Sequence, residues 1–139
     1  MTVKLMKSKL HRIRVTEAKL DYTGSLTIDE DLMDAAGIFN YEKLLVANVD
    51  NGERFETYAI RGPRGSKVCC LNGAAAHKGK AGDKLIVMTW ATMDASEAKD
   101  FVPKVVVLDD GLYRRKQSAA LARNKMSMPA RRKSSGVCR

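Results

Sequence analysis

Short apolar segments separated by turn residues dominate the chain, a pattern typical of a mainly β protein. The sequence predicts strands at residues 3–15, 44–49, 53–60, 67–71, 84–92 and 105–108. The tripeptide Asp-Asn-Gly at residues 50–52 predicts a tight hairpin turn between two of them. Six or more short strands with little helix indicate a small closed β-barrel.

Two short helices are expected between these strands. Asp29 can cap a helix over residues 30–36, and Gly37 follows as its stop signal. Asp94 and Glu97 form a capping pair for a second helix. The fold class is therefore mainly β with a few short helices.

Charge divides the chain into two regions. Nine of the 25 Lys and Arg residues lie in residues 112–139, which contain no acid, and the other 16 balance the 16 acids of residues 1–111. The tail is too poor in large apolar residues to offset its ordering entropy. We therefore expect one domain over residues 1–111 and a disordered basic tail over 112–139, with a helical turn near residues 117–123. Charge alone carries no specificity, so nucleic-acid binding is not favoured.

Several classes of protein are excluded by what the sequence lacks. Adjacent Cys69 and Cys70 suit neither a disulfide framework nor a zinc site, and indicate a reducing cytoplasm. His11 and His77 have no neighbours in metal-ligand spacing, so we expect no metal. No apolar run approaches the roughly 20 residues that span a bilayer, so we expect no membrane partner.

The Gly24 and Ser25 pair could be a reaction site. Glycine tolerates backbone conformations closed to other residues, so a strained bend can lie at Gly24, and the Ser25 hydroxyl could attack the preceding carbonyl. An ordinary loop before a strand is the alternative, and for the dipeptide by itself it is the commoner structure.

Further polar residues could surround the peptide bond between Gly24 and Ser25. Lys9 and His11 can share one face of the first strand, and Arg54 and Tyr58 one face of a hairpin strand. Thr57 would then point away unless a bulge intervenes. The alternative for Arg54 and Tyr58 is a surface arginine and a half-buried tyrosine.

Several motifs in order resemble bacterial aspartate 1-decarboxylase, the pyruvoyl-dependent aspartate α-decarboxylase. The motifs are Lys7-Ser8-Lys9-Leu10-His11-Arg12, Val15-Thr16-Glu17-Ala18, Tyr22-Thr23-Gly24-Ser25, Thr27-Ile28-Asp29, Asn51-Gly52, Thr57-Tyr58-Ala59-Ile60, Arg64-Gly65-Ser66 and Asn72-Gly73-Ala74-Ala75-Ala76-His77. The likeness runs from about residue 1 to residue 108, and the tail from Leu112 matches nothing in the family core.

The resemblance implies a six-stranded double-psi β-barrel, made as an inactive proenzyme and assembled as a cytoplasmic homotetramer. In that family the chain cuts itself at the bond that corresponds here to Gly24 and Ser25. The serine hydroxyl attacks the preceding carbonyl to give an ester, elimination yields dehydroalanine, and hydrolysis leaves a pyruvoyl group. Ser25 would thus become the covalent cofactor, in place of pyridoxal phosphate.

The implied reaction converts L-aspartate to β-alanine and carbon dioxide for pantothenate and coenzyme A synthesis. The substrate amine would condense with the pyruvoyl ketone as a Schiff base, and Tyr58 would return a proton after decarboxylation. Arg54 and Lys9 would bind carboxylates, and Thr57 would support cleavage and contact substrate. The remaining implied site residues are Gly73, Ala74 and Ala75 against the substrate, and His11, Tyr22 and Asn72 as lining or orienting groups.

Two other functions stay open. The same barrel could remain uncleaved, as a scaffold or as a proenzyme that waits for a maturation partner. Alternatively, a non-enzymatic barrel could bind nucleic acid or an acidic partner through its basic tail.

Overall fold

The computed structural model describes residues 1–109 and 112–117. Its strands are β1 (Thr2–Arg14), β2 (Glu17–Lys19), β3 (Ser25–Asp29), β4 (Lys43–Asn48), β5 (Arg54–Gly62), β6 (Cys69–Asn72), β7 (Lys84–Asp94), β8 (Lys104–Asp109) and β9 (Leu112–Gln117). Its helices are α1 (Glu30–Ala36), the 3-10 helix η1 (Gly73–Lys78) and α2 (Ala95–Ala98). No helix within this described part is long and apolar enough to cross a membrane.

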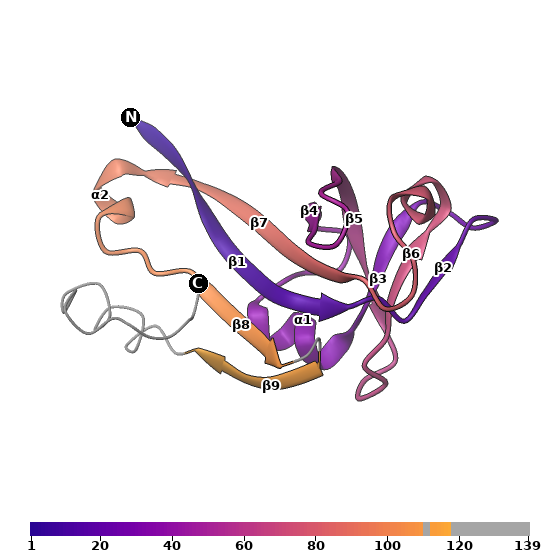
Figure 1. The fold of residues 1–139 in the computed structure, drawn as a ribbon. Coiled ribbons are helices and arrows are strands. Elements are labelled where there is room, and N and C mark those ends of the chain that lie inside the picture. The colour runs from indigo at the N-terminus through magenta and orange to yellow at the C-terminus, as the bar shows by residue number, and fades with distance from the viewer. Residues whose placement is uncertain (110–111, 118–139) are drawn as a thin grey trace.

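The strands form one sheet in the order β2-β6-β3-β5-β4-β7-β1-β8-β9. Figure 1 shows β1 and β7 as two long strands side by side, with the N-terminus and α2 at one end and β2, β3 and β6 at the other. The mainly β class with few short helices is confirmed. The described residues form nine strands, three more than the six segments predicted individually, and no ladder among them joins β2 to β9 to close the sheet.

The additional strands are those whose sequences carry little periodicity. β2 has 3 residues and β3 has 5, too few for an alternating pattern to be decisive. β9 pairs antiparallel with β8 from Leu112 to Gln117, which differs from the disordered tail expected from residue 112. Backbone pairing along an existing edge does not require apolar side chains, so composition did not reveal this strand. Residues 118–139 lie outside the described residues, and with them most of the helical turn expected near 117–123.

The predicted turn and caps are confirmed. Gly52 has a φ of 77° in the turn between β4 and β5, and Ala47 pairs with Arg54 across the hairpin. Gly37 ends α1 in the left-handed conformation, with a φ of 74°. Asp94 and Glu97 make both hydrogen bonds of a capping box at α2.

Alternation along β3 separates an apolar face from a polar one. Leu26 and Ile28 are completely buried in the main core, whereas Ser25 and Thr27 occupy the intervening positions. Leu26 and Ile28 therefore anchor β3, and Ser25 is held at a defined place without contributing to the apolar core.

Asp29 joins the end of β3 to the loop that precedes β6. Asp29 is 3% exposed, and its carboxylate caps α1 by accepting the Asp31 N–H at 2.9 Å. It also accepts the N–H groups of Gly65 at 2.9 Å and Lys67 at 2.7 Å. Gly65 and Lys67 both have positive φ, 82° and 62°, which turns their N–H groups toward one acceptor. One side chain thus fixes two connections at the same end of the β3 and β6 ladder, the exit from β3 into α1 and the loop that enters β6.

We predict that Asp29→Ala lowers the free energy of unfolding by about 2–4 kcal/mol, because a helix cap and two further partly buried N–H groups lose their acceptor. Urea unfolding at one fixed protein concentration measures the loss. Asp31→Ala is the control, since Asp31 is exposed and pairs with Arg64 on the surface, and it should cost less than about 1 kcal/mol. Equal losses in the two variants would contradict the assigned role of Asp29.

Candidate functional site

The antiparallel pairing of β3 with β6 brings two segments of the predicted site together. Ser25 lies opposite Asn72, and Thr27 lies opposite Cys70. The intervening pair, Leu26 and Leu71, is completely buried on the other face of the ladder. Four polar side chains therefore share the face that does not enter the apolar core.

Hydrogen bonds hold Ser25 at the start of β3. The Asn72 side chain donates from Nδ2 to Ser25 Oγ at 3.0 Å and to Thr27 Oγ1 at 2.8 Å. Ser25 donates its own hydroxyl proton to the Thr23 carbonyl at 3.3 Å. Ser25 is 2% exposed and Asn72 is 1% exposed, so both side chains are shielded from bulk water.

Close backbone packing lies beside Ser25, and Gly73 makes it possible. Gly73 has a φ of 64°, and a Cβ there would lie 2.6 Å from the Tyr22 carbonyl oxygen and 2.7 Å from Gly24 Cα. We expected the strained glycine to be Gly24, but Gly24 does not have a positive φ. The left-handed residue is Gly73, across from the bond in question, because the chain leaves β6 there to enter η1.

A pocket of about 350 Å³ opens next to Gly24. β3 pairs with β5 only from Ala59 onward, so before Ala59 that edge of β5 has no partner strand among the described residues. The pocket lies along this open edge. Its lining is Gly24, Phe55, Glu56, Thr57, Tyr58, Ala74, Ala75 and Lys78.

The open edge explains why Thr57 and Tyr58 both reach the pocket. We expected Thr57 to need a bulge in order to join Tyr58, but β5 pairs with β4 without any shift of register from Arg54 to Tyr58. Side chains on the two faces of a strand can both border a space that lies beyond its edge. No bulge is required.

The other predicted site residues do not border this pocket. Lys9 and His11 pair with Met88 and Ile86 in a regular section of β1, so they share a face as predicted. β4 and β7 separate β1 from β5 in the sheet, however.

Arg54 and Tyr22 are also outside the pocket lining. Arg54 is exposed at the first position of β5, on the same face as Tyr58. Tyr22 is 60% exposed, and its ring lies 5.6 Å from the Lys19 ammonium. Asn72 and Gly73 are buried, and Gly73 packs against the backbone of Gly24.

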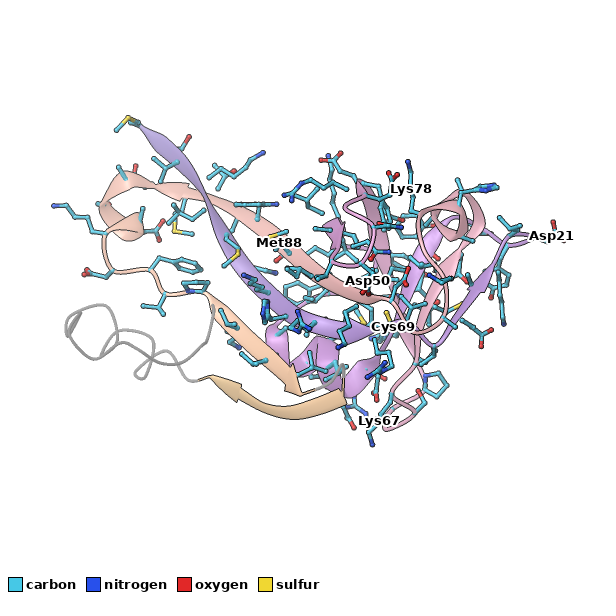
Figure 2. All side chains as sticks on the ribbon, in the orientation of Figure 1. Asp21, Asp50, Lys67, Cys69, Lys78 and Met88 are labelled. Atoms are coloured by element: carbon cyan, nitrogen blue, oxygen red, sulfur yellow. The ribbon has the colours of Figure 1, made fainter. Side chains whose placement is uncertain are left out.

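Sequence reasoning missed several residues near the site. Lys78, labelled beside β5 in Figure 2, lines the pocket at the end of η1, and its ammonium lies 3.1 Å from Glu53. Thr27 and Cys70 contact Asn72. A period of two could have identified both, since Thr27 follows Ser25 by two residues on β3 and Cys70 precedes Asn72 by two on β6.

The two cysteines have different surroundings. Cys69, labelled in Figure 2, is completely buried, and this burial raises the pKa of its thiol. Burial also raises the pKa of Cys70, and the nearby Glu17 carboxylate raises it further. Both thiols therefore keep their protons at neutral pH. Among the residues that the structure describes, no group of three or more His, Cys, Asp or Glu could hold a metal ion.

We predict that Gly73→Ala destabilises the protein more than Gly52→Ala does. Both glycines have positive φ, but a Cβ at Gly52 would meet nothing within 4 Å. Gly52→Ala should therefore cost about 1–2 kcal/mol from backbone strain alone. Gly73→Ala adds overlap with backbone atoms of residues 22 and 24, for a total of about 2–5 kcal/mol. Urea unfolding of the two variants measures the difference, and equal losses would contradict the close packing at Gly73.

Comparisons with known proteins agree on one family. The aspartate decarboxylase family matches residues 1–112. A protein of Parabacteroides distasonis named aspartate 1-decarboxylase is 59% identical over 109 residues, which cover 78% of this chain and 94% of that protein. Two further proteins with the same name are similar. The protein of Caldicellulosiruptor saccharolyticus is 54% identical over 79% of this chain and 86% of that protein. The protein of Phenylobacterium zucineum is 56% identical over 80% of this chain and 94% of that protein.

Proposed function

This chain belongs to the aspartate decarboxylase family, and we propose that it decarboxylates L-aspartate to β-alanine and carbon dioxide, for pantothenate synthesis. The single observation that carries the proposal is the buried Ser25 held opposite Asn72, with Gly24 packed against Gly73. The mainly β sheet is consistent with the double-psi β-barrel implied by the resemblance. The comparisons do not support the alternative of a scaffold or of a binder that acts through its basic tail.

The chain makes its own cofactor at Ser25 in this proposal. The Ser25 oxygen bonds to the Gly24 carbonyl carbon while the peptide C–N bond breaks and the hydroxyl proton moves to the Ser25 nitrogen. Elimination then takes the Ser25 α-proton and releases Gly24 as a carboxylate, and hydrolysis of the resulting dehydroalanine releases ammonia. The products are a chain of residues 1–24 and a longer chain that begins with a pyruvoyl group.

The residues present fit such a group. Ser25 is nearly inaccessible to water, and Asn72 holds an N–H donor on its oxygen. A pyruvoyl group supplies the ketone that condenses with the substrate amine and withdraws electrons from the bond to the leaving carboxylate. Ala74 and Ala75 keep the adjacent pocket free of bulky side chains.

Two polar side chains on β5 act on the substrate. The Tyr58 hydroxyl returns a proton to the carbon that loses carbon dioxide, and the Thr57 hydroxyl supports cleavage and contacts the substrate. Both residues border the pocket together with Gly24, which supports these roles. No pyridoxal phosphate is needed.

The two cations assigned to the dianionic substrate, Arg54 and Lys9, do not line the pocket of their own chain, which favours an assembly. Arg54 is exposed on the face of β5 that carries Tyr58, and Lys9 lies on β1, two strands away from the β4–β5 hairpin in the sheet order. We infer a cytoplasmic homotetramer in which Lys9 and His11 of one chain complete the pocket of another, and Tyr22 covers it. Arg54 binds a substrate carboxylate through its planar guanidinium. A maturation partner could accelerate the cleavage.

We predict that the purified chain releases labelled carbon dioxide from L-aspartate carrying an isotope at its α-carboxylate. A carbonyl-reactive reagent such as phenylhydrazine should abolish this activity, because the cofactor is a ketone. Ser25→Ala should be inactive, whereas the control Ser66→Ala, at an exposed serine that bonds the Pro63 carbonyl, should be unaffected. Activity that survives in Ser25→Ala is incompatible with the proposal.

We predict that two inactive variants restore activity when they are mixed. Lys9→Ala and Tyr58→Phe chains that are unfolded and refolded together should form some pockets with an intact Tyr58 from one chain and an intact Lys9 from its neighbour. Thr57→Ala mixed with Tyr58→Phe is the control and should remain inactive, because both residues border one pocket of one chain. No recovery in mixed tetramers, verified by native mass spectrometry, would argue against a shared site.

A further inference from the structure

Three hydrogen bonds determine which way the Asn72 side-chain amide faces. Its two N–H donors are used by Ser25 Oγ at 3.0 Å and Thr27 Oγ1 at 2.8 Å. Its carbonyl oxygen, Oδ1, accepts the Cys70 S–H at 3.1 Å. The Leu71 carbonyl is the other acceptor near this thiol, at 3.9 Å, so Asn72 Oδ1 is the nearer partner.

The strand register places all four side chains for this arrangement. Ser25 pairs with Asn72 and Thr27 pairs with Cys70, so the two hydroxyls stand side by side on β3, and the amide and the thiol on β6. Cys70 is 4% exposed, so water has little access with which to replace its S–H bond. Burial also raises the pKa of the thiol, which keeps its proton available as a donor.

The direction of the amide decides the role of Ser25. In the observed orientation Ser25 accepts from Asn72, and its own proton points to the Thr23 carbonyl. If the amide rotated by half a turn, Oδ1 would face Ser25 and compete for that proton, and the N–H donor on the serine oxygen would be lost. The thiol and the Thr27 hydroxyl oppose this rotation, one from each end of the amide.

We propose that Cys70 and Thr27 are positioning residues that lock the Asn72 amide with its N–H donor on the oxygen of Ser25. This inference rests on the proposed function, in which that oxygen attacks the Gly24 carbonyl. Neither residue touches the bond that breaks. They act through Asn72, and removal of either should slow cleavage without preventing it.

The first test measures the rate at which newly made chains are cut, by intact-mass spectrometry over time. Cys70→Ala, which removes the donor, should slow cleavage by about three- to tenfold, the effect of one lost hydrogen bond. Cys70→Ser, which keeps a donor, should stay within about twofold of the wild-type rate. Thr27→Val should slow cleavage as Cys70→Ala does, and Thr27→Ser should stay near the wild-type rate as Cys70→Ser does. A Cys70→Ala chain that is cut at the wild-type rate, or a Cys70→Ser chain as slow as Cys70→Ala, overturns the inference.

Cys69 provides a matched control on the same strand. It is completely buried, but it lies opposite Ile28 on the other face of the β3 and β6 ladder. Cys69→Ala should lower the melting temperature at least as much as Cys70→Ala does, because a buried sulfur is lost in each case. Its cleavage rate should stay within about twofold of wild type. Equal slowing in the two alanine variants would mean that packing, and not orientation of the amide, sets the rate.

A second measurement does not depend on cleavage and so separates this inference from the proposed function. In the uncleavable Ser25→Ala chain, Asn72 loses the serine oxygen but keeps its bonds to Cys70 and Thr27, and NMR can follow solvent exchange of its side-chain amide protons. Adding Cys70→Ala should accelerate that exchange by about tenfold or more, and adding Cys69→Ala should not. Unchanged exchange with Cys70→Ala overturns the lock even if aspartate is decarboxylated, and accelerated exchange supports it even if the wild-type chain is never cut.

Discussion

The pairing of β3 with β6 is the constraint on which the candidate site depends. Because side chains alternate along both strands, a register that places Leu26 opposite Leu71 in the core also places Ser25 opposite Asn72 on the other face. A shift by one residue would expose the apolar pair and bury the polar pair in its place. The free energy of core burial thus maintains the position of the serine.

The space around Gly24 arises from two features of the backbone. Gly73 lets the chain turn into η1 while it packs against residues 22 and 24, where a Cβ would overlap with backbone atoms. Within the part of the chain that the structure describes, β5 has no partner strand on one edge until Ala59, and this leaves the pocket beside Gly24. The bond that we propose is cut therefore lies between a tightly packed side and an open one.

Much of the fold could be predicted from local patterns in the sequence. The hairpin around Gly52 and the caps at Asp29, Gly37 and Asp94 follow from turn and capping preferences, which act over a few residues. The short strand β2 and the edge strand β9 could not be predicted, because long-range pairing rather than their own periodicity creates them, and β3 was indicated only as the strand that would follow a loop at Gly24 and Ser25. The described residues therefore contain more strands than the six segments that periodicity identifies.

The candidate site was predicted in part. The pocket brings together Gly24, which its own chemistry had indicated, with Thr57, Tyr58, Ala74 and Ala75, whose roles were implied by resemblance to a family. The strained residue was assigned to Gly24 and is Gly73, because positive φ depends on the path of the chain and not on glycine alone. The contact of Cys70 with Asn72 was missed, since a buried cysteine has the pattern of a small apolar residue.

The most direct test of the central claim is an intact-mass spectrum of the purified, denatured protein. We predict two chains, residues 1–24 and residues 25–139, the second starting with a ketone that reacts with a hydrazide instead of with an amino group. A cut at any other bond would contradict the account. So would an uncut chain of 139 residues in a preparation that decarboxylates aspartate.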